Sequence, residues 1–321
     1  MSTDLLSDVL KDLRADSVVT GHFSMTAPWA IRKPDVTGAP FRTCAGEPFY
    51  LVVEGLPPVH VAPGDFVLLP HGHEHVMCSS LEVEPVPFYQ LMESQGIRTR
   101  FDTPLHFAAG GGGEASELYT GIVLYRQLAR NPLLKALPPL IHVRAHDPAI
   151  APWLASTLQS FIAESMACAP GWALAATRLA DLLFVQLLRA HLQSALNRTD
   201  WLRGLADPKI GKALGLIHRD PRREWSVAEL AEAAGMSRSR FSARFVELVG
   251  ETPISHLTAY RMFLASGELA DGKRKLIEVA ESIGYTSEKA FSRAFRRWSG
   301  VPPRRYTRDA QILFDQALSH G

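Results

Sequence analysis

The chain has 321 residues, 46% of them hydrophobic, which is enough for two domains with ordinary cores. Its 34 basic and 33 acidic residues give a formal net charge of +1, a balance that by itself argues against a nucleic-acid partner. The three cysteines lack metal-type spacing and indicate a reducing compartment rather than a disulfide framework.

Two segments bear on membrane association. Residues 1–17 alternate acidic residues with leucines and lack the basic-then-apolar pattern of a secretion signal, so we expect an amphipathic helix there. Residues 171–190 are apolar but are interrupted by charged and polar side chains, so we expect no membrane span. The chain is predicted to be a soluble cytoplasmic protein with no membrane partner.

Residues 18–107 are rich in valine, phenylalanine, proline and glycine. Short apolar runs at 49–53, 59–61 and 66–69 are bounded by turn residues, a pattern that predicts the strands of a small β-barrel or sandwich. Gly64 and Asp65 are expected to turn the chain into one strand, and Pro70 and Gly72 to turn it out again.

The segment from Gly64 to His75, GDFVLLPHGHEH, resembles the second conserved motif of cupin barrels. Residues 45–47, Ala-Gly-Glu, resemble the end of the first cupin motif. The similarity covers about residues 20–107 and implies a cupin-like sensor domain, which we place at residues 1–148.

The histidines do not complete a cupin metal site. Cupin enzymes carry a His-x-His pair and a glutamate in the first motif, where this chain has Arg32, Lys33, Asp35 and Ala39. His71, His73 and His75 alternate and are weak metal candidates, but Gly72 argues against a regular strand, and a catalytic metal generally needs three protein ligands. We therefore expect no metal, no other cofactor and no enzymatic activity; a metal-binding cupin enzyme fused to a DNA-binding domain is an alternative.

A barrel interior can hold a small molecule. The effector is unknown, and the candidate ligand-binding residues are Trp29, Arg42, Cys44, His60, His75 and His106. A second alternative is a thiol redox sensor that uses Cys44 and Cys78. The run Gly110–Gly113 lacks the ending of a phosphate loop and is interpreted as a flexible surface loop or lid.

Two helices are expected at residues 151–168 and 171–194, separated by Pro170, which cannot continue a helix. The second has an apolar surface, including Leu179, Leu183 and Leu187, that is wide enough for more than one neighbour. We assign residues 149–203 to a helical linker and dimerisation region of a homodimer, with the final linker at 197–205.

A helix-turn-helix pattern occurs twice in the last hundred residues, at 227–245 and 276–295. In each copy a short helix ends at a glycine, Gly235 or Gly284, which favours a left-handed turn. A serine at the N-cap of the next helix, Ser237 or Ser287, is expected to satisfy orphan N–H groups. Aromatic residues four positions apart, beginning at Phe241 and Phe291, predict the buried face of that second helix. Two such units can contact two adjacent major-groove segments of DNA.

The opposite faces of the second helices carry short polar and cationic side chains, which suit base edges and phosphates. The DNA-binding candidates are Arg238, Ser239, Arg240, Ser242, Ala243, Glu288, Lys289, Ser292, Arg293, Arg296 and Arg297. Residues 207–309 hold 19 basic and 13 acidic residues, a charge of +6, which leaves −5 for the rest of the chain. The charge distribution thus favours a basic DNA-binding domain attached to an acidic partner domain.

Residues 207–309 resemble the DNA-binding domain of the AraC/XylS family of bacterial transcription regulators. The second half, IEVAESIGYTSEKAFSRAFRRWSGVPPRRY, looks like the family signature around the second recognition helix. The resemblance implies seven helices, with a long one at about 253–269, and an AraC-type domain at 204–310 with helix-turn-helix subdomains at about 226–249 and 275–299. It also implies an α+β chain that acts as a ligand-responsive activator, with double-stranded promoter DNA and RNA polymerase as partners.

Overall fold

The structure is a computed structural model that describes residues 15, 17–97, 103–124, 137–145, 151–194, 204 and 207–308. The chain forms two compact units. We call them the β unit, which contains Ala15–Leu128 and Pro138–His191, and the helical unit, which contains Leu192–Gly321. The helix expected at residues 1–17 and the linker expected at 197–205 lie almost entirely outside the described residues.

The β unit consists of strands with a few helices. The elements are β1 (Ser17–Thr26), β2 (Ala30–Lys33), β3 (Ala39–Gly46), β4 (Phe49–Val53), β5 (Val59–Val61), β6 (Phe66–Leu68), β7 (His75–Cys78), β8 (Val86–Pro87), α2 (Phe88–Ser94), β9 (Leu105–Gly110), β10 (Ala115–Leu124), β11 (Ile141–Val143), α4 (Ala151–Ala167) and α5 (Trp172–Ser194).

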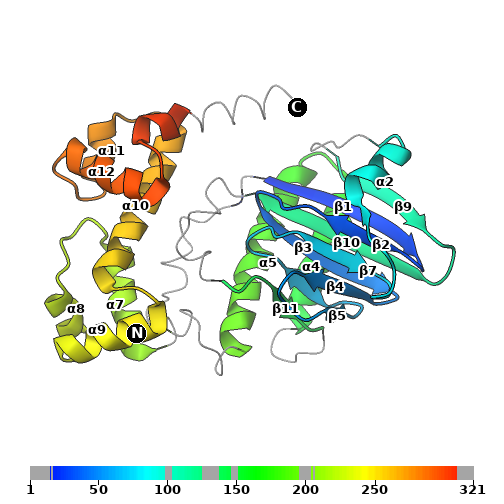
Figure 1. Cartoon of the computed structure of the whole chain (residues 1–321), viewed down its shortest axis with the longest axis horizontal. Helices are drawn as coiled ribbons and strands as arrows, with labels where there is room; N and C mark the ends of the chain where they lie inside the picture. Colours follow the sequence, from blue (N-terminus) through cyan, green and yellow to red (C-terminus); the bar gives the residue numbers. More distant parts are fainter. Residues whose placement is uncertain are drawn as a thin grey trace. The chain divides into compact units, whose positions relative to one another are not determined.

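The strands pair into two sheets (Figure 1). The six-stranded sheet has the order β11-β6-β3-β10-β1-β9, and the five-stranded sheet has the order β5-β4-β7-β2-β8. The strands β4 and β5 have the predicted bounds, while β6 ends one residue earlier than predicted, at Leu68.

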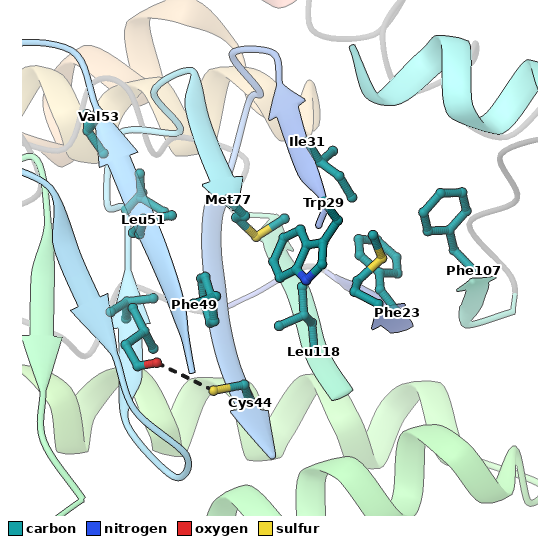
Figure 2. Packing of buried hydrophobic residues seen from close by; sticks show 14 of the residues in the cluster. Phe23, Trp29, Ile31, Cys44, Phe49, Leu51, Val53, Met77, Phe107 and Leu118 are labelled. Carbon is teal, nitrogen blue, oxygen red and sulfur yellow. Dashed lines mark hydrogen bonds between the residues drawn. The ribbon is translucent and has the colours of Figure 1, made fainter. Parts of the chain in front are cut away.

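A cluster of buried apolar side chains lies between the two sheets (Figure 2). Ile31 of β2, Cys44 of β3 and Met77 of β7 belong to this interior, and side chains that alternate with them point to the other face of each strand. Figure 2 shows Phe49, Met77 and Leu118 converging on Trp29 from both sheets. Burying this apolar surface is the main stabilising contribution of the β unit.

The outer face of the six-stranded sheet packs against α4. Phe41 stacks on Phe66 with ring centroids 5.3 Å apart and meets Phe161 of α4 edge-on at 5.2 Å. The helices expected at 151–168 and 171–194 are therefore present, and they belong to the same compact unit as the sheets.

The glycine run 110–113 differs from the expected flexible loop. The N–H groups of Gly111 and Gly113 donate to the carbonyls of Thr26 and Ala27, at 2.9 and 2.8 Å. A Cβ on Gly110 would lie 1.9 Å from the carbonyl oxygen of Thr26. The glycines are required because this segment crosses the end of β1 at backbone contact distance.

The helical unit contains the helix-turn-helix repeats. Its helices are α7 (Pro208–Arg219), α8 (Val227–Ala233), α9 (Arg238–Val249), α10 (Pro253–Asp271), α11 (Leu276–Ser282) and α12 (Glu288–Ser299), followed by the helical residues 303–308. Residues 207–308 thus contain the seven helices implied by the resemblance, including the long one, and the chain as a whole is α+β as predicted. Among the described residues no helix is long and apolar enough to cross a bilayer.

Candidate nucleic-acid interface and interior site

The first helix-turn-helix consists of α8 and α9. Ser226 and Glu229 form a capping box at the start of α8, in which Oγ of Ser226 accepts from the N–H of Glu229 at 3.1 Å. Gly235 has φ 63°, the left-handed conformation predicted for the turn. Ser237 occupies the N-cap of α9 as expected, but its side chain makes no capping hydrogen bond, so the predicted role of its hydroxyl is wrong.

The second helix-turn-helix repeats this arrangement with α11 and α12. Gly284 has φ 87°, and Oγ of Ser287 accepts from the N–H of Ala290 at 3.4 Å, as predicted. Each repeat has its own buried core, in which the predicted aromatic residues of the second helices are fully covered: Phe241, Phe245, Phe291 and Phe295.

The faces opposite these aromatics are open to solvent. Ser242, Glu288 and Ser292 are half-buried, and the other eight DNA-binding candidates are exposed: Arg238, Ser239, Arg240, Ala243, Lys289, Arg293, Arg296 and Arg297. Each set lies along one face of its helix. We call the two faces, as given by these eleven residues, the α9 face and the α12 face.

The cations of the helical unit fall into two groups. Several cations off the α9 and α12 faces are engaged within the chain: Arg244 pairs with Asp207 at 3.2 Å, and Arg274 pairs with Glu268 at 2.6 Å. On the two faces, by contrast, the described structure contains no ion pair for the five arginines and Lys289. Among the described residues, the one ion pair on these faces joins Glu288 to Arg304, with 3.9 Å between the charged atoms. The faces therefore present positive charge that the described part of the chain does not neutralise.

A hydrogen-bonded connection fixes the two repeats to each other. Arg261 of α10 donates from Nη2 to the carbonyls of Arg222 and Arg223, at 3.1 and 2.9 Å, and from Nε to the carbonyl of Pro221. Arg222 donates in turn from Nε to the carbonyl of Ser282, at the end of α11. The segment between α7 and α8 is thereby tied to both α10 and the second repeat.

In the β unit, two of the ligand-binding candidates contact each other across the interior. Nη2 of Arg42, on β3, lies 3.0 Å from Nε2 of His75, on β7. Nδ1 of His75 lies 2.9 Å from the carbonyl oxygen of His73, which can only accept, so Nδ1 carries the proton and Nε2 accepts from Arg42. Burial, reinforced by the charge of Arg42, lowers the pKa of His75 to about 3. The ring is therefore a neutral acceptor.

The other ligand-binding candidates separate into two groups. Trp29 and Cys44 belong to the interior cluster. His60 and His106 do not line the interior: both are exposed, His60 beside Tyr50 and His106 beside His22 on the outer surface of β1. In a three-residue strand such as β5, the direction of each side chain depends on the pairing partner, which the sequence does not specify.

Lys33 was not among the candidates, yet it lies in the same interior. It is the register partner of His75 across β2 and β7. Its Nζ lies 3.0 Å from the centroid of the Phe88 ring. Burial, with a further contribution from Arg42, holds the pKa of Lys33 well below its usual value. The alternation of Ile31 and Lys33 along one strand was the signal that could have identified it.

The weak metal candidates do not form one group: the ring centroids of His71 and His73 lie 5.4 Å apart, whereas the ring of His75 lies against Arg42. His75 begins β7 and is buried, whereas His71 and His73 lie in the preceding turn, where His73 is exposed. Within the described residues no three His, Cys, Asp or Glu side chains are grouped as metal ligands.

Cys44 and Cys78, the cysteines of the β unit's strands, are poorly suited to redox sensing. Cys44 and Cys78 are buried, and burial raises the pKa of both thiols, that of Cys44 to about 12 with a further contribution from Asp65. A high pKa suppresses the thiolate that reacts with oxidants. Cys168 is exposed.

Two capped helix-turn-helix repeats with unneutralised basic faces, attached to a two-sheet β unit, define a DNA-binding transcription regulator with a separate sensor-type unit. Family models agree: residues 4–193 match the cupin family and residues 230–309 match a helix-turn-helix domain. The chain belongs to the AraC-like transcription regulators with an N-terminal cupin domain.

Two relatives illustrate the extent of the match. An AraC-like transcription regulator of Streptomyces lividans is 34% identical over 308 residues, which cover 94% of this chain and 97% of that protein. The HTH-type transcriptional regulator AlkR of Acinetobacter baylyi is 31% identical over 247 residues, 76% of this chain and 79% of that protein. Among solved structures, ToxT from Vibrio cholerae with bound unsaturated fatty acid is similar at 12% identity with a TM-score of 0.33, covering 92% of this chain and 96% of ToxT.

Proposed function

We propose that the chain recognises promoter DNA by placing the α9 face and the α12 face in successive major-groove segments of one duplex. The observation that carries this proposal is the division of the cations. Arg244 lies on the same helix as Arg238 and Arg240, but it is held by Asp207 and Glu247. The two face arginines have no such partner within the described chain, so their charge is available to phosphates and base edges.

Individual roles follow from position on each helix. Arg238, Ser239 and Ser242 lie in the N-terminal half of α9, where a recognition helix approaches base edges most closely. Lys289, Ser292 and Arg293 have the corresponding places on α12, whereas Arg296 and Arg297 lie one turn later and suit phosphates. The pairing of Glu288 with Arg304 leaves Glu288 a smaller role in base recognition than was expected.

The test begins by selecting preferred duplexes from a random pool with the full-length protein. Arg293→Ala and Arg238→Ala should each weaken binding to the selected site, by about 1–3 kcal/mol where the arginine contacts a base. Arg297→Ala should weaken binding to all sequences. It should also reduce the slope of the logarithm of affinity against the logarithm of salt concentration by about 0.9. Arg244→Ala is the matched control and should leave affinity unchanged. Selection of no sequence, or equal loss in the control, would overturn the proposed interface.

The regulator is further proposed to act as a homodimer. On α5, Leu183 and Leu187 are buried, but Leu182 and Leu174 are 43% and 64% exposed, so the helix keeps apolar surface for a second copy of the chain. Leu182→Arg should convert the protein to a monomer. Light scattering after gel filtration measures the mass in solution. Leu81→Arg, at another exposed leucine of the β unit, should not.

The proposed response to an effector resides in the β unit. An effector that binds one state of the protein more tightly than another shifts the population of DNA-binding states by that difference in affinity. We further propose that the protein acts in the cytoplasm as an activator, with RNA polymerase as its partner. The chain acts by binding alone, and no catalytic step is part of the proposal.

A further inference from the structure

The interior of the β unit contains a group of basic side chains among apolar ones. Arg42 lies two residues from Cys44 on β3, Lys33 two from Ile31 on β2, and His75 two from Met77 on β7. Cys44, Ile31 and Met77 all belong to the interior cluster. Because residues two apart on a strand point to the same face, the three basic side chains also point between the sheets.

The cations of this group have no negative partner in the described part of the chain. Nη1 of Arg42 donates to the carbonyls of Phe41 and Gly121, at 2.6 and 3.1 Å, and Nη2 donates to the neutral ring of His75. Lys33 lies over the ring of Phe88, and neither cation is within ion-pair distance of a carboxylate among the described residues. A buried charge without a counter-charge is costly, and a bound anion removes that cost.

Two buried donors in this interior also lack an acceptor. One is Nε of Arg42, whose residue is only 2% exposed, and the other is Nε1 of Trp29, 4% exposed. Figure 2 shows the indole nitrogen of Trp29 pointing into the cluster on the side of Leu118. Buried donors are almost always satisfied in a folded protein, so each of these two can still donate to an acceptor.

The surroundings restrict the kind of anion. Apart from the basic group, the interior consists of aromatic and aliphatic side chains, among them Phe23, Met77 and Leu118. A singly charged group is easier to remove from water than a dianion, and an attached apolar body gains by packing against these side chains. Lys33 is half-buried, so the basic group reaches towards the surface at that residue.

We infer that the interior of the β unit binds an organic monocarboxylate, whose carboxylate is held by Arg42 and Lys33 and whose apolar body packs against the interior cluster. This inference names the chemical class of the effector and so rests on the proposed function. His75 is a positioning residue, because it holds the guanidinium of Arg42 from the opposite sheet. Effector binding then engages both sheets, since Arg42 and Lys33 belong to different ones.

The test uses the full-length protein and four probes at constant ionic strength: benzoate and hexanoate, with benzamide and hexanamide as their neutral counterparts. Titration calorimetry should show saturable binding of a carboxylate and at least tenfold weaker binding of its amide. Lys33→Met should weaken carboxylate binding at least tenfold. Arg32→Met is the matched control: Arg32 is next to Lys33 on β2, is exposed and pairs with Glu74, so binding should not change.

Arg42→Met should also abolish carboxylate binding. If the Arg42→Met protein does not fold, Lys33→Met alone tests the basic group. The inference is overturned if neither carboxylate saturates, if the amides bind equally well, or if Lys33→Met binds like the unaltered protein. Duplex binding is measured separately without any probe. Failure to bind DNA would refute the proposed function without affecting the carboxylate result. Failure to bind carboxylates would refute this inference without affecting the DNA-binding result.

Discussion

Gly284 lies directly against the backbone carbonyl of Arg222: a Cβ at this glycine would be 2.5 Å from that oxygen. Gly235, the corresponding turn residue of the first repeat, has open space around it. Two glycines that look equivalent in the sequence therefore serve different purposes. Gly235 provides only the left-handed turn, whereas Gly284 also allows the segment between α7 and α8 to approach the second repeat.

This difference predicts unequal costs of substitution. Gly235→Ala should lower the free energy of unfolding of the helical unit by about 1–2 kcal/mol, the cost of a left-handed conformation for a residue with a Cβ. Gly284→Ala should cost more, because the same strain is joined by displacement of Arg222. Urea unfolding of the two variants measures the difference, and equal costs would contradict the account.

The proposed DNA site has two boxes, one contacted by the α9 face and one by the α12 face. The connection through Arg261 predicts a variant that loses affinity for the site with both boxes but keeps its affinity for a duplex with one box. Arg261→Met removes three hydrogen bonds to the carbonyls at residues 221–223, so the two repeats lose their fixed mutual orientation. Affinity for the complete selected site should fall about tenfold, because engaging one box no longer positions the second repeat. Affinity for a duplex with a single box should change less than twofold.

Fluorescence anisotropy with the complete and the single-box duplexes measures both affinities. Arg223→Met is the control, since Arg223 pairs with Glu229 inside the first repeat. Parallel losses on both duplexes would show that Arg261 does not act through orientation.

The buried ring of His75 predicts a dependence of stability on pH. Its pKa is about 3 in the folded protein and about 6.5 in the unfolded chain, so between these values the unfolded state binds more protons. The free energy of unfolding therefore loses nothing to His75 above pH 6.5. It falls by about 1.4 kcal/mol per pH unit as the pH decreases from 6.5 towards 3. Between pH 6.5 and 5 the loss is about 2 kcal/mol.

His75→Gln should reduce this slope by about 1.4 kcal/mol per pH unit, the contribution of one proton. The amide oxygen of glutamine can accept from Arg42 but does not titrate in this range. Urea unfolding of the β unit at pH 7, 6 and 5, for both proteins, measures the slopes. The same slope in the variant would show that His75 titrates normally in the folded state.

The cysteines should differ sharply in reactivity. In the native protein at neutral pH, N-ethylmaleimide should modify the exposed Cys168 within minutes and leave Cys44 and Cys78 unmodified, since burial raises the pKa of both thiols. Mass spectrometry of peptides identifies the modified positions. Rapid modification of Cys44 would return redox sensing to consideration, and denatured protein should be modified at all three cysteines.

The sequence was most informative where function depends on local pattern. Glycine turns and aromatic spacing predicted both helix-turn-helix repeats, because the buried face of a helix is determined by residues three and four positions apart. The interior of the β unit was predicted less well. Whether His60 points inward, or Lys33 meets His75, depends on pairing between strands distant in sequence. The hydroxyl of Ser237 likewise failed to cap α9 although its backbone has the expected conformation.

The same limit explains the glycine run at 110–113. In isolation four glycines indicate an unrestrained loop, and only the tertiary structure shows that they cross β1 at contact distance. Short-range patterns specify which residues form an element, whereas close contacts between distant backbones must be seen in the folded chain.

The packing of Phe161 on Phe41 also bears on where the protein can be divided. A fragment that stops at the predicted sensor boundary, residue 148, would leave Phe41 and Phe66 uncovered on the outer sheet surface and should aggregate. The shortest piece suited to crystallisation or to calorimetry with candidate effectors therefore extends through α5. The region assigned to dimerisation is therefore also part of the folded sensor unit itself.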